Sequence, residues 1–341
     1  MRAYLQRLTE RESLSQLEMQ EVMEQIFTED ITDSEIAALM VGLKTKGETV
    51  EEIVGIVQSL RDKALPFKKK IPNVMDNCGT GGDGSKSFNI STTSAFVIAG
   101  AGIPVAKHGN RSISSKTGSA DVLEYLGINW NLPPEASEEL IHEIGIAFLF
   151  APYVHPQIKR IMKVRKDLRI PTVFNLIGPL TNPIELESQL LGIYRRDLLP
   201  MFAEVLKTLG RKRAVVLNGA GFMDEASLAG VNHLAILENG VITNRTLHPE
   251  EVGLSVYDNM AIQGGDSREN AEILLQVLKG KKDARRDTVL LNAGIGIYAN
   301  GKAASIVEGV KMAEDSIDSG AALQKLEQLV EKSKAYQAEV I

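Results

Sequence analysis

The sequence has little cysteine and few aromatic residues. Cys78 is the single cysteine among 341 residues, so no disulfide can form within the chain, and we expect a reducing, cytoplasmic setting. Phe, Trp and Tyr together make up 5% of the chain, which argues against binding of single-stranded nucleic acid by base stacking. The net charge of −6 argues against nucleic acid as a partner as well, because general nucleic-acid binders are more often basic.

Long apolar runs are also absent. The first residues, MRAYLQRLTERESLSQ, are charged throughout and lack the apolar centre of a signal peptide. No run of about 18 apolar residues occurs, so no transmembrane helix and no membrane partner are expected. The hydrophobic share is nevertheless 44%, which is enough for a sizeable core. These features predict a soluble, cytoplasmic protein.

A further absence is local, because residues 84–120 contain no Asp or Glu. At the chain's average of 44 acidic residues in 341, about five would be expected there. The same segment holds eleven Ser or Thr residues and four basic ones, and it overlaps the glycine-rich stretch DNCGTGGDGSKSFNIS at 76–91. This combination is typical of a site for a small polyanion, which backbone N–H groups, hydroxyls and cations would hold together.

Two familiar phosphate motifs do not explain the glycine stretch. The P-loop spacing GxxxxGK[ST] does not occur, and GTGGDG at 79–84 matches the dinucleotide pattern GxGxxG only formally. Asp83 inside the loop would repel a pyrophosphate unless a metal ion or a sugar hydroxyl intervenes. A second polar cluster, KHGNRSISSKTGSAD at 107–121, follows the next predicted strand. Because ligands of open α/β sheets lie at the carboxyl ends of strands, the two loops are predicted to frame one site.

The pattern of apolar residues predicts an α/β protein with two domains. Residues 1–65 space their apolar residues three and four apart and contain the capping-box spacings Thr32-x-x-Glu35 and Thr49-x-x-Glu52. From residue 73 strands alternate with helices, which is typical of a mostly parallel sheet covered by helices. We predict a small all-helical domain at 1–70, joined by part of 160–185, and a large α/β domain at 71–341. Strands are expected at 73–77, 104–109, 146–152, 213–219, 232–240 and, as VLLNAG, 289–294.

Several motifs, in their order along the chain, resemble those of the anthranilate phosphoribosyltransferase family. They are GTGGD, NIST at 89–92, KHGNR at 107–111, SSKTGSAD at 114–121, VRKDL at 164–168, FNLIGPLTNP at 174–183 and MDEAS at 223–227. The resemblance covers nearly the whole chain, and it implies an enzyme of tryptophan biosynthesis. Such an enzyme transfers the phosphoribosyl group of 5-phosphoribosyl 1-diphosphate (PRPP) to the amine of anthranilate, giving N-(5-phosphoribosyl)anthranilate and diphosphate. Members of the family are homodimers that bind Mg²⁺.

The resemblance also implies which residues form the site. Those expected to contact PRPP are Gly79, Gly82, Asp83, Ser87, Asn89, Ile90, Ser91, Thr92, Lys107, His108, Gly109, Asn110, Arg111, Ser114, Ser115 and Ser119. Those expected to contact anthranilate are Gly79, His108, Asn110 and Arg165, and those expected to hold Mg²⁺ are Ser91, Asp224 and Glu225. An aromatic amine is already deprotonated at neutral pH, so no general base is required, and His108 is the only candidate. Ser87 and Arg169 stand where the family often has Thr and Gly.

Two alternatives stay open at this point. A pyrimidine nucleoside phosphorylase would share the fold and a similar KHG–SS arrangement, although it would lack the combined GTGGD, GNR and FNLIGPLTNP motifs. A non-catalytic relative that binds nucleic acid would need a basic surface, which the net charge of −6 disfavours.

Overall fold

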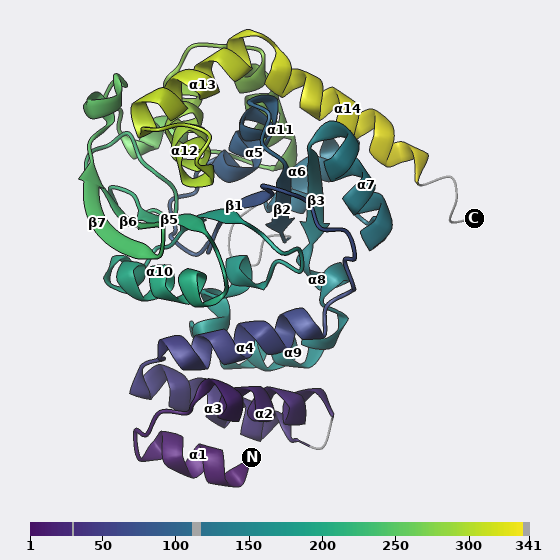
Figure 1. Ribbon diagram of the computed structural model, residues 1–341, viewed down its shortest axis with the longest axis vertical. Helices are drawn as coiled ribbons and strands as arrows, with labels where there is room; N and C mark the ends of the chain where they lie inside the picture. The colour runs from purple at the N-terminus through teal and green to yellow at the C-terminus, as the bar shows by residue number, and fades with distance from the viewer. Residues whose placement is uncertain (29–30, 111–116, 337–341) are drawn as a thin grey trace.

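The computed structural model describes residues 1–28, 31–110 and 117–336. A layer of helices from the N-terminal part of the chain lies at one end, and beyond it a sheet is covered by helices on both faces (Figure 1). The predicted fold class, a helical N-terminal part followed by an α/β part with a mostly parallel sheet, is confirmed. None of the helices in the described ranges is both long enough and apolar enough to span a membrane.

The N-terminal layer consists of α1 (Arg2–Thr9), α2 (Gln16–Phe27), α3 (Asp33–Lys46) and α4 (Val50–Asp62). Both predicted capping boxes are confirmed, since Thr32 Oγ1 accepts from Glu35 N at 3.2 Å and Thr49 Oγ1 accepts from Glu52 N at 3.3 Å. Each box satisfies N–H groups that have no partner inside the helix, and so fixes where the helix begins.

A later helix, α9 (Lys159–Leu168), joins this layer by packing against α3. Arg160 Nε and Lys163 Nζ pair with the two carboxylate oxygens of Asp33 at 3.2 and 2.6 Å. α9 is therefore attached to the helical layer although it lies far from it in the sequence.

The sheet has, among the described residues, seven strands in the order β3-β2-β1-β4-β5-β6-β7. The first five run parallel, and β6 and β7 add an antiparallel edge. β2 and β3 lie on one side of β1 and β4 lies on the other, so the strand order reverses there, and ligands of open α/β sheets bind at the carboxyl ends of the strands at such a point. The strands are β1 (Met75–Gly79), β2 (Val105–Gly109), β3 (Ile146–Phe150), β4 (Ser188–Gly192), β5 (Arg213–Asn218), β6 (Asn232–Glu238) and β7 (Val241–Leu247).

Helices cover both faces of the sheet (Figure 1). α10 lies between one face and α4, and one buried apolar cluster joins this face to α10, α9 and the N-terminal layer. A second cluster fills the space between the other face and α5 with α11 to α14. The remaining helices are α5 (Ile90–Gly100), α6 (Ser119–Tyr125), α7 (Pro134–Ile144), α8 (Ala151–Val154), α10 (Leu199–Thr208), α11 (Ser267–Leu278), α12 (Ala284–Asn300), α13 (Ile306–Asp318) and α14 (Ala321–Ala335). The division of the chain into domains at residue 70 stays a prediction.

The strand predicted at VLLNAG was wrong, because residues 289–294 lie inside α12. All six residues are buried, so polar and apolar positions do not alternate along the segment. Periodicity therefore cannot distinguish a buried helix from a buried strand here. β4 and β7 were not predicted. β7 is exposed over most of its length at the edge of the sheet, and it lacks the alternation that marks a half-buried strand.

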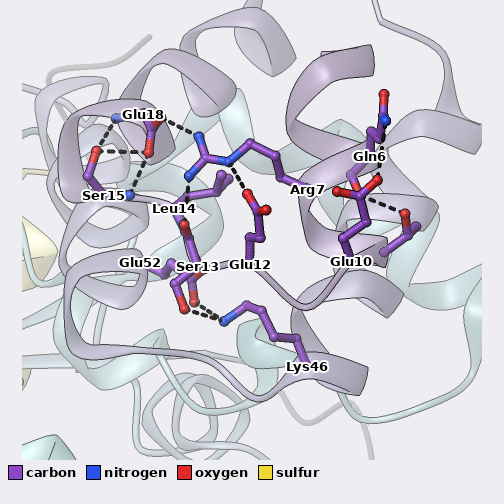
Figure 2. Close-up of polar contacts among 11 residues, drawn as sticks. Gln6, Arg7, Glu10, Glu12, Ser13, Leu14, Ser15, Glu18, Lys46 and Glu52 are labelled. Carbon is purple, nitrogen blue, oxygen red and sulfur yellow. Dashed lines mark hydrogen bonds and ion pairs between the residues drawn. The ribbon is translucent and has the colours of Figure 1, made fainter.

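A buried ion pair holds the N-terminal layer together (Figure 2). Lys46 Nζ lies 2.9 Å from Glu52 Oε2, and the two side chains are 5% and 0% exposed. The other carboxylate oxygen, Oε1, accepts from Leu14 N at 2.9 Å, so Glu52 also fixes the chain between α1 and α2. Breaking a buried pair leaves one uncompensated charge, which costs more than the pair itself contributes.

We expect Lys46→Met to lower the free energy of unfolding by about 3 kcal/mol, because Glu52 then stays buried without its cation. Urea unfolding followed by circular dichroism measures the loss. Lys44→Met is the matched control, since Lys44 lies on the same helix and is exposed. Equal losses in the two variants would contradict the role given to the buried pair.

Candidate active site

The turn at 219–225 packs closely on the carboxyl ends of β1 and β4. A Cβ atom on Gly79 would lie 2.4 Å from Asp224 Oδ2, and one on Gly192 would lie 1.6 Å from the Asp224 carbonyl oxygen. Gly81 adopts φ +67°, which L side chains rarely tolerate, and its N–H donates to Asp224 Oδ2 at 2.6 Å. The glycine residues therefore allow the backbone of this stretch to pack closely against Asp224.

A second contact joins this turn to the start of α5. Ser91 N, in the first turn of the helix, donates to Glu225 Oε1 at 3.1 Å. Lys107 Nζ, from the end of β2, donates to Ser91 Oγ at 3.2 Å and to the Asn77 carbonyl oxygen at 3.0 Å. Lys107 is 2% exposed, and its ammonium forms hydrogen bonds that connect β2 with β1 and α5. Its predicted contact with PRPP stays a prediction.

Three carboxylates meet at this place. Burial raises the pKa of Glu225 to about 7, with Lys107 acting in the opposite direction. Burial, together with repulsion from Asp83 and Glu225, raises the pKa of Asp224 well above its usual range. Buried carboxylates that repel one another are well suited to bind a cation.

The donors fit Mg²⁺, because the side chains of Ser91, Asp224 and Glu225 offer oxygen only. Ser91 N donates to Glu225, and Asp224 is the preceding residue in the chain. In residues 1–28, 31–110 and 117–336, no group of three or more His, Cys, Asp or Glu side chains is placed to hold a metal ion.

His108, at the end of β2, is buried with a fixed ring. Its Nδ1 lies 3.2 Å from the carbonyl oxygen of Gly178, in the 3₁₀ helix Gly178–Thr181. Because a carbonyl only accepts, Nδ1 is assigned the proton and Nε2 the lone pair. Nε2 is buried and has no hydrogen-bond partner within the described parts of the chain. Burial, and then His155, lower the pKa of His108 to about 3, so the ring is neutral at physiological pH.

Other predicted PRPP residues are held by contacts within the glycine loop and with the segment around α11. Asp83 Oδ1 accepts from the N–H and the hydroxyl of Ser85, both at 3.0 Å. Asn89 Oδ1 accepts from Asn270 Nδ2 on α11 at 2.9 Å. Ser87 forms an isolated bridge with Gln263, so the segment before α11 pairs with the chain between the glycine loop and α5.

The loop after β2 returns to the site through Ser119. The Ser119 hydroxyl donates to the Asn110 carbonyl oxygen at 3.1 Å, and a Cβ on Gly109 would lie 2.5 Å from that hydroxyl. Gly82 has φ +81° in the glycine loop, and Ile90 and Thr92 are buried at the start of α5. Arg111, Ser114 and Ser115 lie outside the described residues.

Arg165 lies on α9, and no hydrogen bond or ion pair joins it to the other predicted site residues of the described chain. Its Nη1 donates to Met162 Sδ at 3.1 Å, and burial lowers its pKa. A half-buried guanidinium without a carboxylate partner is suited to bind a carboxylate ligand. Arg169, at the C-terminus of α9, has φ +53°, a left-handed conformation that favours Gly, the residue that the resemblance implies at this position.

Two functional candidates were missed by sequence reasoning. Asp76, in β1, and Asn182, in the FNLIGPLTNP motif, are both 0% exposed and hydrogen-bonded to each other. A carboxylate inside a predicted strand was the available signal for Asp76. For Asn182 the only signal was the motif itself, to which no role had been given.

Comparison with known proteins gives the same arrangement of two parts. The sequence model described as "Glycosyl transferase family, helical bundle domain" matches residues 2–64, and "Glycosyl transferase family, a/b domain" matches 71–323. The anthranilate phosphoribosyltransferase of Bacillus cereus (strain B4264) is 57% identical over 333 residues, which cover 98% of each chain. That of Bacillus mycoides (strain KBAB4) is 56% identical over 333 residues, again 98% of each. The chain belongs to the anthranilate phosphoribosyltransferase family.

Solved anthranilate phosphoribosyltransferases share the fold over nearly the whole chain. The enzyme from Thermus thermophilus is 40% identical with a TM-score of 0.92, covering 97% of this chain and 99% of that one. The Saccharomyces cerevisiae enzyme, solved in complex with PRPP and Mg, is 26% identical with a TM-score of 0.89 and covers 98% and 97%.

We expect the pH dependence of kcat/KM for anthranilate to contain no ionisation of His108 between pH 5 and 8. Its pKa of about 3 lies below this range, so the ring stays neutral throughout. The measurement compares the pH profiles of the wild type and His108→Asn. An inflection near the ordinary histidine pKa that only the wild type shows would contradict the neutral ring.

Proposed function

We propose that this chain transfers the phosphoribosyl group of PRPP to the amine of anthranilate and releases diphosphate. The observation that carries the proposal is the packing of Asp224 and Glu225 onto the glycine loop and the start of α5, at the switch point of the sheet. The family membership supplies the reaction, and this arrangement supplies groups that suit its sugar diphosphate substrate.

The reaction breaks the bond between C1′ and the diphosphate oxygen and forms one between C1′ and the amine nitrogen. Such displacements develop positive charge at C1′ and negative charge on the leaving group. α5 follows β1 in the chain, and the positive end of its dipole would attract oxyanions of PRPP. Mg²⁺, held by Ser91, Asp224 and Glu225, would offset the charge that the leaving diphosphate gains.

The nucleophile needs orientation more than activation. An aromatic amine is neutral at pH 7, so its lone pair is available without a base. The neutral ring of His108 offers Nε2 as a hydrogen-bond acceptor, to which an amine N–H would donate. Its low pKa makes it a poor base, so we assign His108 to orientation of the amine.

The test of the proposal is to mix the protein with PRPP, Mg²⁺ and anthranilate and to follow anthranilate fluorescence. Fluorescence should decrease only when all components are present. Folded protein that causes no decrease would contradict the proposal. Phosphorolysis of thymidine or uridine, measured in parallel, would instead support a nucleoside phosphorylase.

We expect Arg165→Ala to raise the KM for anthranilate roughly 10- to 100-fold, which corresponds to loss of one charge-assisted hydrogen bond. The KM for PRPP should change little, because Arg165 is predicted to meet the anthranilate carboxylate. Steady-state kinetics with each substrate varied in turn measures both values. Lys166→Ala, an exposed neighbour on α9, is the control, and unchanged constants in both variants would remove Arg165 from the site.

Asp83→Asn should raise the KM for PRPP roughly tenfold at limiting Mg²⁺, because a carboxylate beside the diphosphate is suited to bind magnesium waters or ribose hydroxyls. Saturating Mg²⁺ should reduce the difference. Asp83 accepts two hydrogen bonds from Ser85, so a Ser85→Ala control measures how much of the effect comes from loop structure. An unchanged PRPP affinity at limiting Mg²⁺ would contradict this role.

We further propose that the protein works as a homodimer in the cytoplasm, as the resemblance of its motifs to this family implies. Light scattering coupled to size-exclusion chromatography measures the oligomeric state. A mass of one chain at working concentration would contradict the dimer.

A further inference from the structure

Asp76 is a fully buried carboxylate to which the reaction described above gives no role. It lies on β1 and is 0% exposed. Its Oδ1 accepts from the backbone N–H of His108 at 3.3 Å, and its Oδ2 accepts from Asn182 Nδ2 at 3.0 Å. The same Asn182 nitrogen donates to the Ala106 carbonyl oxygen on β2 at 2.8 Å. Asp76 thus joins β1, the end of β2 and the FNLIGPLTNP segment.

The ring of His108 is held by the other end of that segment. Its Nδ1–H donates to the Gly178 carbonyl oxygen, four residues before Asn182. Thr181 Oγ1 donates to the same carbonyl at 2.9 Å, and Gln189 Nε2 donates to the Pro179 carbonyl at 2.7 Å. The backbone and the ring of His108 are therefore fixed by two contacts that both depend on the position of residues 178–182.

Burying a carboxylate to connect these segments costs free energy, because the charged form loses its hydration. Burial raises the pKa of Asp76 to about 6, although Lys107, Asn182 and the His108 N–H all lower it. Asparagine at this position would have one acceptor atom and an amide NH₂ group that faces a donor, so it could not accept from both sides at once. This place requires two acceptor oxygens, because one fixes the backbone of His108 and the other fixes Asn182.

We propose that Asp76 and Asn182 are positioning residues for anthranilate. They hold the Gly178 carbonyl against His108 Nδ1, which keeps the proton on that nitrogen and leaves the buried Nε2 as the acceptor for the substrate amine. Neither residue touches a substrate; each acts through His108. This inference rests on the proposed function and adds to it a role for the FNLIGPLTNP segment.

The kinetic test uses Asp76→Asn and Asn182→Ala in the full-length protein. Each should lower kcat/KM for anthranilate at least tenfold and change the KM for PRPP less than twofold. Asn300→Ala is the matched control, because Asn300 is a buried asparagine at the opposite, amino-terminal edge of the sheet, where it donates to Ser188 Oγ at 3.0 Å. Asn300→Ala should lower the Tm, but it should not affect the kinetics with anthranilate more than the kinetics with PRPP. Equal effects on both substrates in all three variants would overturn the proposal.

A double-mutant cycle tests whether the effect passes through the histidine. In a His108→Asn background, Asp76→Asn should cause no further loss of kcat/KM for anthranilate. A full additional loss would show that Asp76 acts by another route and would overturn the proposal. A wild type that consumes no anthranilate would contradict the proposed function instead, so the two failures are distinguishable.

A spectroscopic measurement tests the tautomer without any activity. Imidazole ¹⁵N NMR of the free protein, with the His108 signals assigned by their absence in His108→Asn, should show protonated Nδ1 and unprotonated Nε2. Asn182→Ala should convert this single tautomer into a mixture of tautomers. This variant replaces Asp76→Asn in the measurement if Asp76→Asn does not fold. A single unchanged tautomer in a folded Asn182→Ala protein would overturn the proposal.

Discussion

The arrangement of the site depends on the close contact between the Asp224 backbone and the ends of β1 and β4. That contact exists because both strands end in glycine, and any side chain at Gly79 or Gly192 would occupy the space of Asp224. The acidic turn at 219–225 comes directly after β5, and this contact places the turn against the end of β1. β5 itself is not hydrogen-bonded to β1, because β4 lies between them. Glu225 then reaches the first turn of α5, and Lys107 approaches from β2. The glycines thus let segments from four strands converge on one small volume.

This convergence has an electrostatic cost. Asp83, Asp224 and Glu225 repel one another, and burial removes the water that would screen Asp224 and Glu225. Lys107 is the buried cation that offsets part of this charge, and it is fully engaged with Asn77 and Ser91. A cation that binds the carboxylates would therefore also stabilise the folded chain, since whatever binds only the native state adds to its stability.

Much of the fold and part of the site could be predicted from local signals. The capping boxes at Thr32 and Thr49 mark helix starts, and the glycines and the acid-free segment indicate a loop for an anionic ligand. Local signals could not predict the hydrogen-bond partner of each site side chain. The sequence does not reveal that Lys107 turns inward to Ser91 Oγ, or that Asp76 meets Asn182, because these pairs are 16 and 106 residues apart and depend on strand order. VLLNAG failed for a related reason, since a fully buried helix loses the period that identifies it.

α9 belongs to the sequence of the α/β part but packs against α3 and is tied to it by Asp33. Arg165 lies on this helix, whereas the glycine loop, α5 and the acidic turn all lie on the sheet. The proposed carboxylate anchor for anthranilate is thus carried by one layer and the proposed PRPP contacts by the other. The separation between the nucleophile and C1′ is then set by how the two layers sit against each other. A substitution in the α4–α10 interface, which touches neither substrate, would act on catalysis by changing that separation.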